Sequence, residues 1–144
     1  MHATEILYPI LALAAWTGLV LLLIPVARFR AGFRREVRGE DFKFGESAAV
    51  PPQVSIPNRN YMNLLELPLL FYVACMLLFV TSGVTSGAVV LAWVYVALRV
   101  VHSVIHLTYN RVQHRLVAFA MSNAVLVALW VRAGFHVVSS GPGV

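Results

Sequence analysis

Three polar side chains precede an apolar stretch, and their spacing places them on one face of a helix. Arg59, Asn63 and Glu66 lie just before the apolar run at residues 69–80. Residues spaced by four and then three positions share a stripe of an α-helix. If that helix enters a bilayer at Asn58, Glu66 lies about 12 Å deep, at about 1.5 Å of rise per residue. An ionisable group at this depth needs a charged partner or a watery cavity, so we expect Glu66 to have one.

Candidate partners for Glu66 come from two later apolar segments. Arg99, His102 and His106 share a helix face within residues 88–108, and Arg115 opens the segment that follows. Arg99 is expected at nearly the same depth as Glu66, which predicts an ion pair between them. Together with Arg59, these side chains place several cationic or potentially cationic groups around one acid. This surplus favours a site for a small, mainly anionic molecule that enters from the cytosol.

Simpler interpretations of these residues stay open. Glu66 and Arg99 could form a purely structural ion pair. His102 and His106 could bind a metal, but no cysteine or acid on the same helix offers a third ligand, so ordinary hydrogen-bonded histidines are favoured. Arginines beside a span commonly anchor at lipid headgroups. The sequence has no glycine-rich phosphate loop, no GxSxG motif and no CxxC motif.

The composition is typical of a membrane protein. The 144 residues are 60% hydrophobic and 12% charged, whereas soluble domains are about 25% charged. The net charge of +5 does not indicate nucleic-acid binding, because the cations cluster beside apolar runs and form no basic helix face with interleaved aromatics. The single cysteine, Cys75, excludes a disulfide within the chain.

The order of apolar and polar segments predicts an all-α bundle with four transmembrane helices in one domain, 1–144. The spans are expected at about residues 6–26, 58–81, 88–108 and 115–138. Residues 28–57 form one long polar loop, and its prolines at 51, 52 and 57 are expected to break any helix before the second span. A further proline, Pro68, is expected to kink that span just after Glu66. The first span is expected to be a retained helix, since arginines follow it and none precedes it.

The distribution of basic residues predicts the orientation in the membrane. Lysine and arginine occur six times in the 28–57 loop and again in the 109–114 loop, but are absent from the loop at 82–87. The positive-inside rule therefore places loops 28–57 and 109–114 in the cytosol and both termini outside it.

The spacing of the polar residues resembles that of a known family. Arg59-x-x-x-Asn63-x-x-Glu66 is similar to the RxxxNxxE motif of the MAPEG proteins, membrane-associated proteins of eicosanoid and glutathione metabolism. Arg99-x-x-His102, followed by Arg115, is similar to the microsomal prostaglandin E synthase branch of that family. The resemblance extends over all four predicted spans and the long first loop.

The resemblance implies a homotrimer of four-helix bundles, with glutathione bound between neighbouring subunits. Glutathione would then be the cofactor, and a small lipophilic substrate would arrive from the lipid bilayer. Arg115 is implied as the catalytic residue that stabilises the glutathione thiolate. The implied cofactor-binding residues are Arg59, Asn63, Glu66, Arg99 and His102. His106 is added to this expected cofactor-binding set from the polar cluster on the same helix face as Arg99 and His102.

The chain departs from the prostaglandin synthase branch at three positions. His106 and Phe119 stand where that branch has tyrosines, and Leu116 stands where it has a serine. Several hydroxyl donors to glutathione are therefore missing. Two hypotheses follow: a glutathione-dependent membrane transferase or peroxidase, and a non-catalytic MAPEG-like binding or scaffold protein. A transporter is a weaker third, because the outer half of the bundle is almost wholly apolar.

Overall fold

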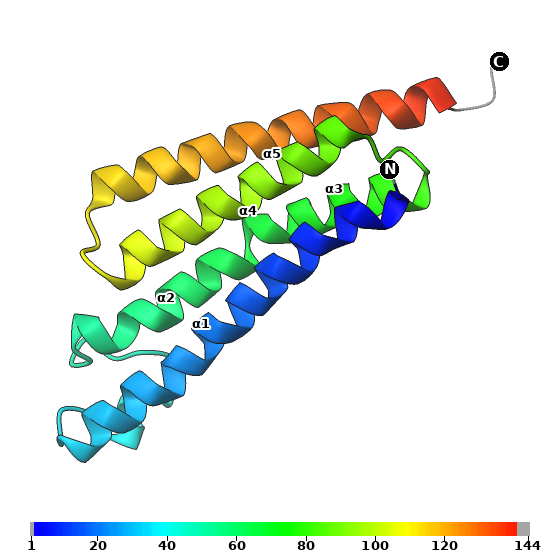
Figure 1. The fold of residues 1–144 in the computed structure, drawn as a ribbon. Helices are drawn as coiled ribbons and strands as arrows, with labels where there is room; N and C mark the ends of the chain where they lie inside the picture. Colours follow the sequence, from blue (N-terminus) through cyan, green and yellow to red (C-terminus); the bar gives the residue numbers. More distant parts are fainter. Residues whose placement is uncertain (1, 141–144) are drawn as a thin grey trace.

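The chain folds into a bundle of long helices that run alongside one another (Figure 1). A computed structural model describes residues 2–140. After a short 3-10 turn at Ala3–Ile6, helix α1 covers Leu7–Phe33. Helices α2 (Pro52–Leu65) and α3 (Leu67–Val80) follow one another across a break, then come α4 (Ser86–Leu107) and α5 (Val112–Ser140).

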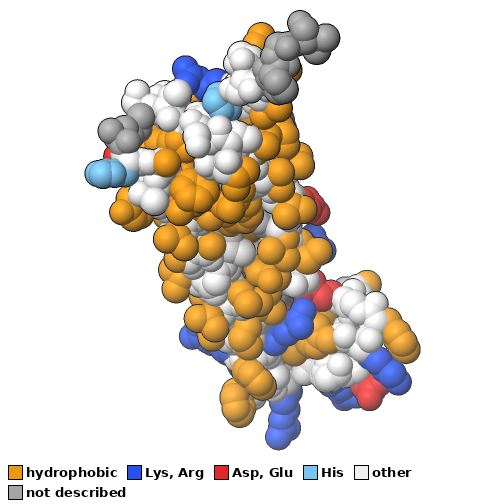
Figure 2. Space-filling model, turned by 90° about the vertical axis from the view of Figure 1, so that its right-hand side faces the viewer, with side chains coloured by type: hydrophobic (Ala, Val, Ile, Leu, Met, Phe, Trp, Pro, Cys, Tyr) orange, Lys and Arg blue, Asp and Glu red, His pale blue; other side chains and the backbone are white. Residues whose placement is uncertain are grey.

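The prediction of four membrane spans is confirmed. Within residues 2–140, four helical stretches are long and apolar enough to cross a bilayer: Ala3–Phe33, Pro52–Val80, Ser86–Leu107 and Val112–Ser140. Figure 2 shows hydrophobic side chains over most of the bundle's length on the face in view, with many of the Lys and Arg side chains at one end. That end carries the connection between α1 and α2, and we call it the loop end.

The loop between the first two spans is shorter than predicted, because helix extends into it from both sides. α1 continues to Phe33, and α2 begins at Pro52. The expectation that the prolines break any helix before the second span is therefore wrong. Pro52 occupies the first turn, where the missing N–H is not needed. Pro57 lies inside α2 and is buried, as are Val54 and Leu64 on the same helix.

The remaining connection, residues 34–51, packs onto the end of α1. Val37 and Val50 are buried against Ala31 of α1 and Val54 of α2. Arg28 forms an ion pair of 3.3 Å with Glu46.

One turn of this connection is closed by a carboxylate. Asp41 accepts hydrogen bonds from the backbone N–H of Arg38, at 2.8 Å, and from the Ser47 hydroxyl, at 3.0 Å. The first of these bonds is the main reason that the pKa of Asp41 is lowered.

A polar contact joins α1, α2 and α4 inside the bundle. Ser103 of α4 accepts a hydrogen bond of 2.9 Å from the Trp16 indole of α1 and one of 2.6 Å from the Asn60 amide of α2. Asn60 and Ser103 are fully buried. Because unpaired polar groups are costly in such surroundings, this contact fixes the position of α2 against α1 and α4.

At the opposite end of the bundle, α5 is bonded to the turn between α3 and α4. His136 contacts the Thr81 carbonyl at 2.9 Å, and Arg132 donates to the Thr85 hydroxyl at 2.8 Å. Gly83 permits this approach, since a Cβ added there would lie 2.7 Å from Cγ of the His136 ring.

We therefore expect Gly83→Ala to displace His136 and to lower the stability of the bundle by about 1–3 kcal/mol. The measurement is thermal unfolding in detergent. Gly18→Ala is the matched control, because a Cβ at Gly18 meets nothing within 4 Å. A Gly83→Ala protein as stable as the control would contradict the close packing described here.

Candidate functional site

The predicted polar residues converge at the loop end, where α2, α4 and α5 meet. A cavity of about 380 Å³ is lined there by Arg59, Asn63 and Glu66 of the second span, His106 of α4 and Arg115 of α5. We call it the polar cavity. The sequence predicted a shared site for these five side chains, and the structure brings them to one cavity wall.

A second, smaller cavity adjoins the first. It measures about 250 Å³ and shares Asn63 and Arg115 with the polar cavity. Its other lining residues include His102, Leu116 and Phe119. Asn63 and Arg115 therefore lie between a cavity of mixed polar and apolar lining and a more apolar one.

Arg115 is held at two points, one on its side chain and one on its backbone. Its guanidinium donates a 2.7 Å hydrogen bond to the Asn110 side chain, in the turn between α4 and α5. Its backbone carbonyl lies 3.0 Å from Nδ1 of His102. Because a carbonyl only accepts, that ring nitrogen carries the proton. Nε of Arg115 is buried and has no hydrogen-bond partner among residues 2–140.

The prediction of a kink just after Glu66 agrees with the structure, in which the second span breaks at Glu66, two residues before Pro68. Glu66 has φ −75° and ψ −91°, between the end of α2 and the start of α3. Pro68 lies in the first turn of α3, where it lacks the N–H that would continue the hydrogen-bond ladder. The last carbonyls of α2 consequently need other donors.

Arg99 supplies one of those donors from α4. Its side chain is fully buried and donates a hydrogen bond to the Asn63 carbonyl. The Phe119 ring lies 5.7 Å from the Arg99 guanidinium carbon. Arg99 thus lies behind Asn63 and lines neither cavity.

The predicted ion pair between Glu66 and Arg99 is wrong. Within residues 2–140 no such pair forms, and Glu66 is exposed on the surface of the bundle. The prediction compared only the depths of the two side chains, and it did not assign Arg99 to the carbonyl that the kink leaves open. The break at Glu66 turns the carboxylate toward the polar cavity, while Arg99 binds the backbone that the break leaves open.

His102 and His106 are buried neighbours with ring centroids 6.1 Å apart. Among residues 2–140, no group of three His, Cys, Asp or Glu side chains is arranged to hold a metal ion. Since Nδ1 of His102 is engaged by the Arg115 carbonyl, this histidine also acts as a link between α4 and α5.

Sequence reasoning missed two contributors to the site. Asn110, which positions Arg115, lies in a turn with φ +48°, and its place before the fourth span was the only available signal. Asn60 was missed although it lies within the Arg59–Asn63 motif, because its side chain points to the core and not along the polar stripe.

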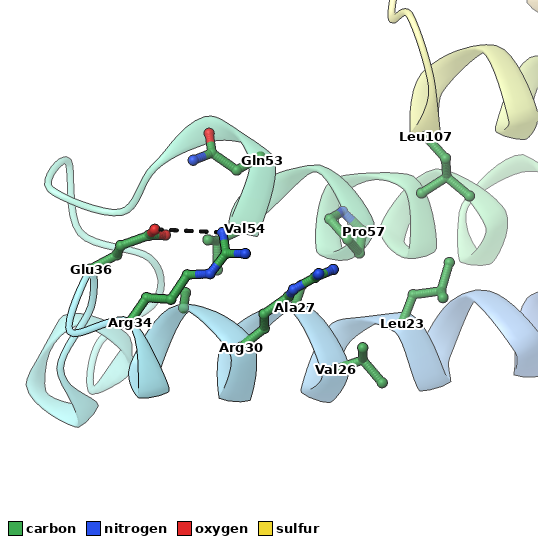
Figure 3. Close-up of a pocket in the computed structure, with 11 residues that line it drawn as sticks. Leu23, Val26, Ala27, Arg30, Arg34, Glu36, Gln53, Val54, Pro57 and Leu107 are labelled. Atoms are coloured by element: carbon green, nitrogen blue, oxygen red, sulfur yellow. Dashed lines mark ion pairs between the residues drawn. The ribbon is translucent and has the colours of Figure 1, made fainter.

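A third cavity, also missed, lies between α1 and α2 (Figure 3). It measures about 490 Å³, and Arg30, Arg34 and Gln53 line it together with mainly apolar side chains. Arg34 faces Glu36 at 3.9 Å, while Arg30 extends between the two helices (Figure 3). This cavity lies on a different face of α2 from the polar cavity.

We expect Arg99→Leu to destabilise the bundle by about 1–3 kcal/mol, because the Asn63 carbonyl loses a buried donor. Glu66→Gln keeps the side-chain size and removes no ion pair, so its stability is expected to match the wild type. Thermal unfolding of both variants in detergent tests this difference. A large loss of stability in Glu66→Gln would indicate that Glu66 does form an ion pair, and it would contradict the structure.

Comparison with known proteins identifies one family. The sequence model of the MAPEG family matches residues 6–135. No curated protein and no solved structure matches the chain. The match covers all four spans, but no homologue supports the microsomal prostaglandin E synthase branch in particular.

Proposed function

The chain belongs to the MAPEG family of four-helix membrane proteins, and from this premise we propose that it is a glutathione-dependent transferase or peroxidase. Its substrate would be a lipophilic electrophile or hydroperoxide from the bilayer. The family includes glutathione transferases and peroxidases as well as non-catalytic members, so the proposal depends on the site of this chain.

The observation that carries the proposal is the position of Arg115 between two cavities. Its guanidinium is fixed by the hydrogen bond from Nη1 to the Asn110 side chain. A cysteine thiol has a pKa of about 8.5 and is mostly protonated at neutral pH. A fixed cation beside the sulfur favours the thiolate, which is the nucleophilic form.

The proposed chemistry then needs few protein groups. The thiol proton leaves to water, and the thiolate sulfur forms a bond to an electrophilic carbon whose leaving group takes the displaced electron pair. With a hydroperoxide, two glutathione molecules become a disulfide while the hydroperoxide is reduced to an alcohol and water. Arg115 stabilises the anionic sulfur before either step.

The other lining residues match the charges of glutathione. The exposed Glu66 carboxylate suits the amino group, and Arg59 suits a carboxylate. Asn63 offers an amide for the peptide backbone, and His102 and His106 line the two cavities. Arg99 is proposed as a positioning residue, since it acts on the Asn63 backbone from behind.

Completion of the site by neighbouring subunits is part of the proposal. Arg59 and Glu66 are exposed on the outer surface of the single chain. A homotrimer would cover them and exclude water from the bound tripeptide. The same reasoning keeps loops 28–57 and 109–114 on the cytosolic side, where glutathione is available, and both termini on the other.

The second candidate function is a non-catalytic binding or scaffold protein. It is favoured by Leu116 and Phe119, which line the smaller cavity without any hydroxyl group. Conjugation of a generic aryl halide to glutathione by the purified protein would exclude this alternative.

We expect Arg115→Ala to lower kcat/KM for glutathione conjugation by about a hundredfold, because a positioned donor to the developing anion is lost. Thiolate absorbance in the ultraviolet, recorded with glutathione and purified protein, should fall as well. Arg111→Ala is the matched control: it removes a nearby cation that lines neither cavity. Negligible glutathione binding by the wild type and the Arg115→Ala variant alike would end the proposal.

A further inference from the structure

A long apolar groove lies between α3 and α5, outside the cavities described above. It encloses about 550 Å³, and its apolar walls are formed by Leu67, Leu70, Leu126, Val127 and Val131. Such walls suit a hydrocarbon chain and offer no charge to bind an ion.

Two polar side chains interrupt these walls. Asn123 and Trp130 both line the groove, and Oδ1 of Asn123 and Nε1 of Trp130 are buried atoms without a hydrogen-bond partner among residues 2–140. Asn123 lies eleven residues after the start of α5 at Val112, a rise of about 16 Å. It is therefore near the middle of a hydrocarbon layer about 30 Å thick.

An amide without a partner at this depth is costly, since lipid chains offer no donor or acceptor. A rotation of the Asn123 side-chain amide would present either its oxygen or its NH₂ group to the groove. A guest that carries an oxygen atom at this level would supply the missing partner, whereas a plain hydrocarbon would not.

The groove also lies further along α5 from the proposed reaction site at Arg115. Arg115, Leu116 and Phe119 line the smaller cavity, and Asn123 follows Phe119 by one turn of α5. Eight residues separate Arg115 from Asn123, a distance of about 12 Å along the helix. A chain lying against α5 could thus place one end beside Arg115 and its middle beside Asn123.

We propose that Asn123 selects lipophilic substrates that carry an uncharged hydrogen-bonding oxygen, such as a hydroxyl, about 12 Å from the group held at Arg115. Asn123 is then a specificity-determining residue. Leu126, Val127 and Val131 hold the chain, and the Trp130 indole lies close to its far end. The inference rests on the proposed function for the chemistry at Arg115, but groove binding itself needs no glutathione.

The test uses two brominated fatty esters, one with a mid-chain hydroxyl and one without it, added to the protein in lipid nanodiscs. Bromine quenches tryptophan fluorescence at short range. The hydroxylated ester is expected to reach half-maximal quenching at about a fivefold lower concentration, the value of one net hydrogen bond. In Asn123→Leu the two esters should become equivalent.

Control variants define the site of quenching. Met121→Leu changes an exposed residue on α5 that does not line the groove, so the fivefold preference should persist. Trp93 is exposed on the apolar surface, so ester dissolved in the bilayer quenches it in every variant. Trp130→Phe should remove the saturable part of the quenching, and saturable quenching that survives this change would place the esters elsewhere and overturn the inference. Asn123→Thr retains a hydrogen-bonding group and should keep part of the preference.

The result separates this inference from the proposed function. Equal quenching by both esters in the wild type, or an unchanged preference in Asn123→Leu, overturns the role of Asn123 even if glutathione conjugation is observed. A hydroxyl preference that disappears in Asn123→Leu supports it even if the protein binds no glutathione.

Discussion

The hydrogen bond from Arg99 to the Asn63 carbonyl is the contact on which the polar end of the bundle depends. A helix broken inside a membrane protein leaves backbone groups without partners, and lipid cannot satisfy them. Arg99 provides a buried donor from α4 at this point. The break can therefore persist, and it lets Glu66 face the polar cavity while Asn63 stays anchored beside Arg115.

This arrangement divides the polar residues into two groups with different tasks. Arg99, Asn60 and Ser103 are buried and hold α2 against its neighbours. Glu66 and Arg115 face open space, where a guest can reach them. A cation buried at such cost is retained because it organises backbone that the site requires.

Much of this architecture could be predicted from the sequence. The lengths of the apolar segments predicted the four spans. Helical spacing predicted that Asn63, His106 and Arg115 share a site, and they line one cavity. Pro68 correctly predicted a kink just after Glu66. It could not reveal that Arg99 would bind the Asn63 carbonyl instead of Glu66, because that choice depends on how α4 packs against α2. The prolines at 52 and 57 predicted a break that does not occur. Pro52 lies in the first turn of α2, and Pro57 is accommodated inside that helix. The role of Asn110 depends on the backbone conformation of a turn. The apolar groove depends on how α3 packs against α5, and the sequence of either helix alone does not show this packing.

The turn between α4 and α5 has a consequence for how this protein can vary. Only residues 108–111 separate the two helices, and Asn110 adopts a left-handed conformation within them. A residue inserted or deleted there and taken up by the first turn of α5 would shift the helical register by about 100° per residue. Arg115 would then leave the cavity wall, and the carbonyl that His102 contacts would move with it. Loop length at this point is therefore a constraint on register, so natural variants should accept exchanged side chains here far more readily than a changed number of residues.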